Sequence, residues 1–245
     1  MKVLACIPAR YGSTRFAGKV LAKDTGKFLI QHTYERACLA KLPEKVIIAA
    51  DDEQVVAAAN SFGAECVLTS VEHKSGTDRI AEAVRDIDVD IIVNLQADEP
   101  EIDPANIDYL AELLIKNPDY PMATLAAEFK RPEQITDPNI VKVILDREGR
   151  AIYFSRAPIP YDREKAGVGA IGQYLRHLGI YAYRKNFLLQ ITTLPQTPLE
   201  KIEKLEQLRA LENGFTILVG KVEHTCDGID TSEQYAEFVK RQRQR

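Results

Sequence analysis

The chain has 245 residues, of which 45% are hydrophobic and 28% are charged, and its formal net charge at pH 7 is −4. At about 100–200 residues per domain, this length predicts one large domain. The composition is that of a globular protein and excludes disordered and fibrous classes. The mild acidity argues against general binding to nucleic acid, which needs a basic surface. An anionic substrate must therefore be held by a local cluster of Arg and Lys.

The cysteine spacing argues for a reducing compartment. Four cysteines are scattered along the chain, with neither a CxxC motif nor a close Cys/His group, so a zinc site or a disulfide framework is not expected. Each cysteine is expected to be a small buried hydrophobe. The apolar run Val3–Ile7 is too short for a signal peptide, and no run approaches the ~20 residues of a membrane span. These features predict a cytoplasmic protein without a membrane partner.

The first half of the chain alternates short apolar runs with amphipathic stretches, which predicts a parallel sheet with helices on both faces. The predicted strands are Val3–Ile7, Val46–Ala50, Cys66–Leu68 and Ile91–Leu95. The predicted helices are Ile30–Leu42, Glu53–Phe62, a helix capped by Thr77 and running to Val84, and Ile107–Leu114.

The second half changes rhythm and predicts an antiparallel portion. Val141–Leu145 and Ala151–Phe154 flank a turn and read as a hairpin, and Arg176–Tyr183 alternates like a strand. A helix over Leu199–Leu211, a strand over Thr216–Val219 and a last helix starting at Thr231, with Gln234 at capping-box spacing, complete the order. Asp162–Gly172 is the one predicted flexible loop. The whole predicts a single domain over residues 1–245, an open α/β sheet with an inserted antiparallel portion.

A basic loop follows the first predicted strand. It carries Arg10, Arg15 and Lys19 with no acidic residue, and Ser13 and Thr14 add hydroxyl groups. Such a loop at the carboxyl end of the first strand of an open sheet is where phosphates bind. The spacing fits neither the GxxxxGK[ST] phosphate loop nor GxGxxG, which disfavours a dinucleotide dehydrogenase. The alternative is an exposed basic loop without a ligand.

Carboxylates follow the fourth predicted strand at Asp98, Glu99 and Glu101. A buried strand that delivers carboxylates at its carboxyl end places hard oxygen ligands over the sheet, and Mg²⁺ with nucleotide phosphates takes one or two of them. Asp98 is the better candidate because it leaves the strand first. The alternative is a solvated acidic turn before the next helix.

Several dispersed polar residues in the second half fit purely structural roles as well as functional ones. His177 fits a core or surface strand position, Glu206 a surface charge that pairs with Arg209, and Asp230 or Thr231 a helix cap.

Taken together, these segments resemble the 3-deoxy-manno-octulosonate (Kdo) cytidylyltransferase family. The matching segments occur in the family's order and span nearly the whole chain: IPARYGSTR (Ile7–Arg15), SGTDR (Ser75–Arg79), QADEP (Gln96–Pro100), YFSRAPIPYDR (Tyr153–Arg163), RHLGIYAYR (Arg176–Arg184), EKLEQLR (Glu203–Arg209) and GIDT (Gly228–Thr231). The resemblance implies a Rossmann-like nucleotide-diphospho-sugar transferase fold whose antiparallel portion serves dimerisation. It also implies Mg²⁺-dependent transfer of CMP from CTP to Kdo, an anionic eight-carbon sugar acid, for lipopolysaccharide biosynthesis, by a homodimer.

The resemblance also implies roles for individual residues. Arg15, Lys19 and Asp98 would be catalytic, and Mg²⁺ would be held by Asp98 and Asp230. The nucleotide would be bound by Arg10, Ser13, Arg15, Lys19, Ser75, Gly76 and Gln96, and the sugar by Arg156, His177, Glu206 and Gln207.

Two positions depart from the family pattern. Ala17 stands where the family usually has proline, so the loop loses a proline but keeps Gly18 and Lys19. Ala97 stands where the family usually has glycine, which adds a methyl group where the backbone approaches the nucleotide. Two rival functions stay open. One is a sister cytidylyltransferase that shares the CTP loop and acts on sialic acid or amino-substituted Kdo. The other is a nucleotide-binding regulator without turnover, which only Ala17 and Ala97 support. The RHLGIY and LEQLR segments favour Kdo.

Overall fold

The structure is a computed structural model that describes residues 1–12, 16, 18–225 and 228–244. The chain divides into two compact units, residues 1–108 with 226–245 and residues 109–225. The single domain predicted over residues 1–245 stays a prediction.

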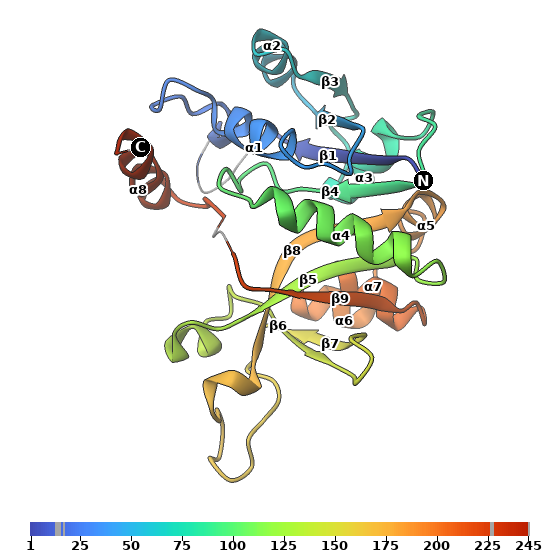
Figure 1. Ribbon diagram of the computed structural model, residues 1–245, viewed down its shortest axis with the longest axis vertical. Helices are drawn as coiled ribbons and strands as arrows, with labels where there is room; N and C mark the ends of the chain where they lie inside the picture. Colours follow the sequence, from blue (N-terminus) through green and yellow to red (C-terminus); the bar gives the residue numbers. More distant parts are fainter. Residues whose placement is uncertain (13–15, 17, 226–227, 245) are drawn as a thin grey trace. The chain divides into compact units, whose positions relative to one another are not determined.

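The first unit contains four parallel strands in the order β3-β2-β1-β4, and Figure 1 shows β1 lying between β2 and β4. Strands β1 and β4 are nearly continuous apolar runs because both of their faces are covered, and every residue from Ile91 to Leu95 is buried. The predicted parallel strands are confirmed. The strands are β1 (Val3–Ala9), β2 (Lys45–Ala50), β3 (Glu65–Leu68) and β4 (Ile91–Asn94).

The helices of this unit follow the strands in turn. They are the 3-10 turn η1 (Lys19–Leu21), α1 (Leu29–Ala37), α2 (Glu53–Ser61), α3 (Gly76–Ala83), α4 (Pro104–Lys116), which runs on into the second unit, and α8 (Ser232–Arg243). Two predicted boundaries were wrong. Helix α1 ends before Leu42 because the backbone N–H groups of Lys41 and Leu42 donate to the Asp108 carboxylate instead. Helix α3 begins at Gly76, and its N-cap is Ser75, which forms a capping box with Asp78, and not Thr77.

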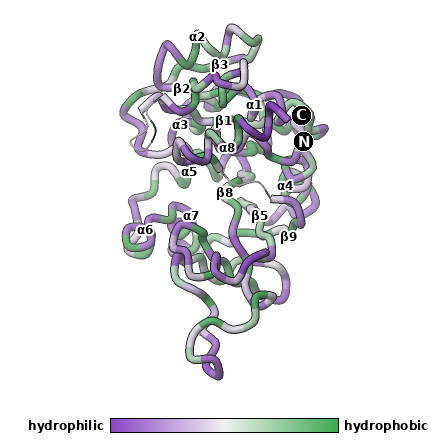
Figure 2. Tube along the Cα trace, turned by 90° about the vertical axis from the view of Figure 1, so that its left-hand side faces the viewer, coloured by the Kyte–Doolittle hydropathy of each residue, from purple (hydrophilic) through white to green (hydrophobic). Residues whose placement is uncertain are grey.

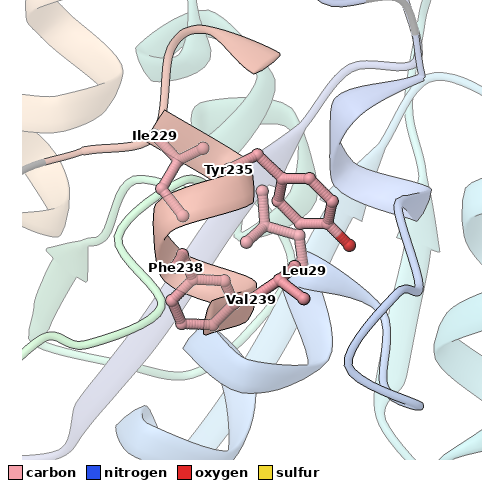
Figure 3. Close-up of a cluster of buried hydrophobic side chains, with 5 residues drawn as sticks. All are labelled: Leu29, Ile229, Tyr235, Phe238 and Val239. Carbon is pink, nitrogen blue, oxygen red and sulfur yellow. The ribbon is translucent and has the colours of Figure 1, made fainter. Parts of the chain in front are cut away.

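Helix α8 is fastened to α1 by an apolar cluster. Tyr235, Phe238 and Val239 from α8 gather with Ile229 around Leu29 of α1 (Figure 3). The predicted capping box is present, with the Thr231 hydroxyl accepting from the Gln234 N–H. The segment that leads into α8 is thereby held against α1.

The second unit has β5 at the centre of its strands. β5 (Met122–Glu128) pairs antiparallel with β8 (Leu175–Arg184) and parallel with β9 (Ile217–Val222). The hairpin predicted around residues 147–149 is confirmed as β6 (Lys142–Leu145) and β7 (Ala151–Ser155), with β6 also pairing with β8. The antiparallel portion therefore exists, while its role in dimerisation stays a prediction.

The helices of the second unit correct one prediction and add one element. The expected helix over Leu199–Leu211 is two helices, α6 (Pro198–Glu203) and α7 (Gln207–Glu212), separated at Lys204 with φ 54°. The chain leaves the helix there because Arg156 donates to the carbonyl oxygens of Glu203 and Lys204. Helix α5 (Lys185–Ile191) was not predicted. The long loop between β7 and β8 contains the 3-10 turn η3 (Ile171–Gln173) and is hydrophilic at its tip (Figure 2).

The cysteine environments differ from one another. Cys6 is buried and Cys66 half-buried, and burial raises the pKa of the Cys66 thiol to about 11. Cys38 is exposed, so the prediction that each cysteine is a buried hydrophobe was wrong there. Cys226 lies outside the described residues. Among the described helices, none combines the length and apolar character that a bilayer crossing requires.

Candidate functional site

The centre of the candidate site is a buried lysine between two carboxylates in the first unit. Lys19 Nζ donates to Asp98 Oδ2 at 2.6 Å and to Asp230 Oδ1 at 3.2 Å. Gly18 positions this lysine. It precedes the η1 turn with a φ of 64°, a left-handed backbone conformation that residues other than glycine rarely adopt. The ammonium group of Lys19 thus compensates part of the negative charge of two carboxylates that are 132 positions apart in the chain.

The backbone explains why the two acidic segments meet. Asp98 lies just beyond the carboxyl end of β4, and its carbonyl oxygen accepts the N–H of Ile229 at 2.8 Å. Ile229 is fixed in turn by the α8 cluster of Figure 3. A Cβ built on Gly228 would lie 3.8 Å from Asp98, an ordinary van der Waals contact, so the two segments run side by side without requiring a glycine there. The structure therefore brings together the three residues predicted for metal binding and catalysis that it describes.

The donor set fits a divalent cation. Two carboxylate oxygens converge on one positive group, and Mg²⁺ is typically bound by one or two carboxylates together with phosphate oxygens and water. Among the described residues, no group of three or more His, Cys, Asp or Glu converges in this way. Asp98 and Asp230 would thus form a partial site that a nucleotide completes.

The other predicted nucleotide residues lie at the carboxyl ends of the strands. Arg10 is exposed immediately after β1, and Gln96 is half-buried after β4. The Ser75 hydroxyl accepts the Asp78 N–H at 3.1 Å and so caps α3. Gly76 is backed by Pro8, whose Cγ would lie 3.1 Å from a Cβ built on the glycine. Ser13, Arg15 and Ala17 lie outside the described residues.

The alanine at position 97 fits without backbone strain. Ala97 is nearly buried and does not adopt a positive φ, which the structure shows only at Ala166 and Lys204 among the described non-glycine residues. Its carbonyl oxygen accepts the Thr33 hydroxyl of α1 at 3.1 Å. The departure from the family's glycine is therefore accommodated in this chain.

The predicted sugar residues lie in the second unit, where Glu206 and Gln207 line a small cavity. The cavity has a volume of about 20 Å³, room for about one water molecule. Its other walls come from β5, β8, α5 and α7: Met122, Tyr181, Tyr183, Ile191 and Ala210. Burial raises the pKa of the Tyr181 hydroxyl, and the negative charge of Glu206 raises it further. A neutral tyrosine and a carboxylate thus face the same small space.

Arg156 and Arg209 are both occupied by contacts within the protein. The Arg156 guanidinium donates to the carbonyl oxygens of Glu203, Pro138 and Lys204 at 2.7, 2.8 and 3.4 Å. Arg209 pairs with the buried Glu200 at 2.6 Å. Sequence reasoning missed Glu200 as this partner, although it lies nine residues before Arg209.

His177 is a buried histidine of β8. Its Nε2 lies 2.9 Å from the Thr124 hydroxyl of β5, and its ring contacts Phe154 at an edge-to-face angle of 74°. Burial lowers the pKa of His177 from 6.5 to about 3. The imidazole is therefore neutral at physiological pH, and its only described polar side-chain contact is within the sheet.

This neutral state predicts a pH dependence of stability. The unfolded chain binds a proton at His177 below pH 6.5, whereas the native chain does so only near pH 3, so stability is complete above pH 6.5 and is lost as the pH falls towards 3. The contribution is at most about 1.4 kcal/mol per pH unit in that window. Urea unfolding at pH 7, 6 and 5 should show a steeper loss for the native chain than for His177→Asn. Equal slopes would mean that the histidine is protonated in the native protein.

Comparisons with known proteins give a consistent result. A family model described as cytidylyltransferase matches residues 4–219. A 3-deoxy-manno-octulosonate cytidylyltransferase of Solibacter usitatus (strain Ellin6076) is 52% identical over 232 residues, covering 95% of this chain and 91% of that protein. The protein of the same description from Trichlorobacter lovleyi (strain ATCC BAA-1151 / DSM 17278 / SZ) is 46% identical over the full length of both chains.

A solved structure is similar to this chain throughout. It is described as CMP:2-keto-3-deoxy-manno-octonic acid synthetase complexed with CTP. It is 39% identical, has a TM-score of 0.92, and the match covers 100% of this chain and 99% of that one.

Proposed function

Because the chain belongs to the 3-deoxy-manno-octulosonate cytidylyltransferase family, we propose that it transfers CMP from CTP to the anomeric hydroxyl of Kdo and releases pyrophosphate. The observation that carries the proposal is the meeting of Lys19, Asp98 and Asp230 at the carboxyl ends of parallel strands. A cation beside two carboxylates supplies both the phosphate-binding charge and the metal-binding oxygens that nucleotidyl transfer needs.

In this reaction the anomeric oxygen attacks the α-phosphorus, the bond to pyrophosphate breaks and the hydroxyl loses its proton. The protein contributes alignment and charge more than covalent chemistry. Arg10 and Lys19, with Ser13 and Arg15, would hold the triphosphate, while Ser75, Gly76 and Gln96 would lie near the base and ribose. The exposed position of Arg10 directly after β1 suits contact with a phosphate.

Mg²⁺ is the metal proposed for Asp98 and Asp230. When bound there, it supplies charge that neutralises phosphate oxygens and lowers the pKa of the attacking hydroxyl. Lys19 contacts both carboxylates and compensates one of their two negative charges before any nucleotide arrives. Its charge also suits phosphate oxygens, so binding of the triphosphate would draw the ammonium towards the nucleotide.

The sugar would be bound by Glu206 and Gln207, whose side chains line the cavity beside Tyr181, together with His177 and Arg156. His177, being neutral, offers a hydrogen bond and no charge to a sugar carboxylate. The contacts of Arg156 to backbone carbonyl oxygens use three of its five N–H groups, and the other two would pair with that carboxylate.

Assembly and location complete the proposal. The enzyme would act as a homodimer in the cytoplasm and feed lipopolysaccharide biosynthesis. The resemblance supports the dimer and the pathway, and the scattered cysteines, three of which are free, support a reducing compartment.

Acceptor preference tests the proposed function. Pyrophosphate release should be measured from CTP and Mg²⁺ with Kdo, with N-acetylneuraminate and with no acceptor. We expect turnover with Kdo alone. Turnover with N-acetylneuraminate instead would contradict the proposed sugar, and CTP binding without turnover would favour a non-catalytic role.

A further inference from the structure

A buried arginine outside the residues assigned above joins the loops that follow β2 and β3. Arg79 lies in α3, and its guanidinium donates to the Thr69 hydroxyl at 2.7 Å and to the Ser70 carbonyl oxygen at 3.3 Å. It also pairs with Asp51 Oδ2 at 3.0 Å, and Asp51 is the first residue after β2. Side chains of both partners are largely buried, so each charge depends on the other.

The other oxygen of Asp51 reaches the loop after β1. Asp51 Oδ1 accepts the backbone N–H of Tyr11 at 2.9 Å, and Tyr11 directly follows Arg10. The Tyr11 ring lies beside Gly18, since a Cβ built on that glycine would be 3.7 Å from Tyr11 Cε2. One carboxylate therefore connects a buried arginine to the backbone of the basic loop, between its first and last cations.

Helix α3 takes part in the same arrangement. The Arg79 N–H donates to the Ser75 carbonyl oxygen, and Gly76 lies against Pro8 just before the basic loop. The pair thus fixes the start of α3 and the start of the basic loop, two of the segments proposed to contact the nucleotide.

We infer that Asp51 and Arg79 are positioning residues that hold Arg10 and Tyr11, at the start of the basic loop, in the conformation that binds the triphosphate. The inference rests on the proposed function. Arg10 is one of the residues proposed to hold the triphosphate, and it directly precedes the anchored Tyr11. Anchoring the Tyr11 N–H lowers the ordering cost of binding. Arg79 acts through Asp51, because its guanidinium donates to one Asp51 oxygen while the other accepts the Tyr11 N–H.

The test separates binding of CTP from binding of Kdo. Asp51→Asn keeps the size of the side chain and removes the charge that holds Arg79, and Arg79→Lys removes the planar fork. Each should raise the Kd for CTP, measured by calorimetry without Kdo, by about tenfold. The KM for Kdo should change by less than about twofold.

The double variant should bind CTP only slightly more weakly than either single variant, because both substitutions break the same Arg79–Asp51 connection. A merely structural role would lower the amount of folded enzyme and hence Vmax, while the Kd for CTP stayed constant.

Glu65→Gln is the matched control. It breaks the exposed pair of Glu65 with Lys45, 2.6 Å apart on β3 and β2, and should leave the Kd for CTP unchanged. Should either test variant fail to fold, Thr69→Val removes the hydroxyl to which Arg79 donates, whereas Thr69→Ser keeps it. Thr69→Val should then weaken CTP binding and Thr69→Ser should not.

The outcomes distinguish this inference from the proposed function. If the native chain binds CTP and the variants bind it with the same Kd, the positioning role is overturned and the proposed function stands. If the native chain does not bind CTP, it is the proposed function that fails.

Discussion

Asp98→Asn is expected to lower kcat by about a thousandfold, equivalent to about 4 kcal/mol of transition-state stabilisation, with the fold intact. The substitution keeps the shape of the side chain and an oxygen that accepts from Lys19, but it removes the charge needed to hold a divalent cation beside Asp230. Steady-state pyrophosphate release over a range of Mg²⁺ concentrations measures the effect. Circular dichroism and the thermal midpoint should match those of the native chain.

A neighbouring carboxylate provides the control for this variant. Glu101 lies three residues further on and pairs with Arg241 of α8 at 2.7 Å. Glu101→Gln removes one negative charge from the same loop without touching the Lys19 cluster, so kcat should remain near the native value. A near-native kcat for Asp98→Asn would take Asp98 out of the metal site.

Arg209→Met is expected to cost about 3–5 kcal/mol of unfolding free energy, the largest stability effect predicted for the chain. Arg209 and Glu200 form a fork in which Nε and Nη2 lie 2.9 and 2.6 Å from the two carboxylate oxygens, with both side chains buried. Burial raises the pKa of the Glu200 carboxyl, but the hydrogen bonds and charge of Arg209 outweigh it and hold that pKa below its ordinary value. Removing the arginine leaves a buried carboxylate without its partner.

Two variants separate the ion pair from simple loss of packing. The double variant Arg209→Met with Glu200→Gln removes the stranded charge, so urea unfolding should show it to be more stable than Arg209→Met alone. Lys116→Met breaks the exposed pair with Glu112 on α4 and should cost less than about 0.5 kcal/mol. Equal losses for the single and double variants would mean that packing, and not charge, dominates.

Local signals in the sequence predicted the elements they control. Thr231 and Gln234 predicted the start of α8, and apolar runs predicted β1, β2 and β4. Both signals are local, because a helix cap or a buried strand depends on residues that are close in the sequence. Strand β5 was missed because Met122–Glu128 is rich in alanine, and its strand conformation comes from pairing with β8 and β9. The break between α6 and α7 likewise depends on Arg156, more than 40 residues away.

The candidate site divides in the same way. The resemblance predicted Lys19, Asp98 and Asp230, and the structure brings them together. The Asp51–Arg79 pair was not predicted because no spacing links a residue after β2 with one in α3. The neutral state of His177 follows from its burial. This residue of β8 packs against Thr124 of β5 and Phe154 of β7, contacts that only the tertiary structure reveals.

The fate of labelled phosphate in CTP tests the central claim most directly. The enzyme should be incubated with Kdo, Mg²⁺ and CTP labelled at either the α- or the γ-phosphate, and the products separated. Transfer of CMP to Kdo predicts the α-label in a sugar nucleotide whose mass is that of CMP-Kdo, and the γ-label in an equal amount of pyrophosphate. The α-label in free CMP, or the γ-label in orthophosphate, would show hydrolysis of CTP and contradict the claim.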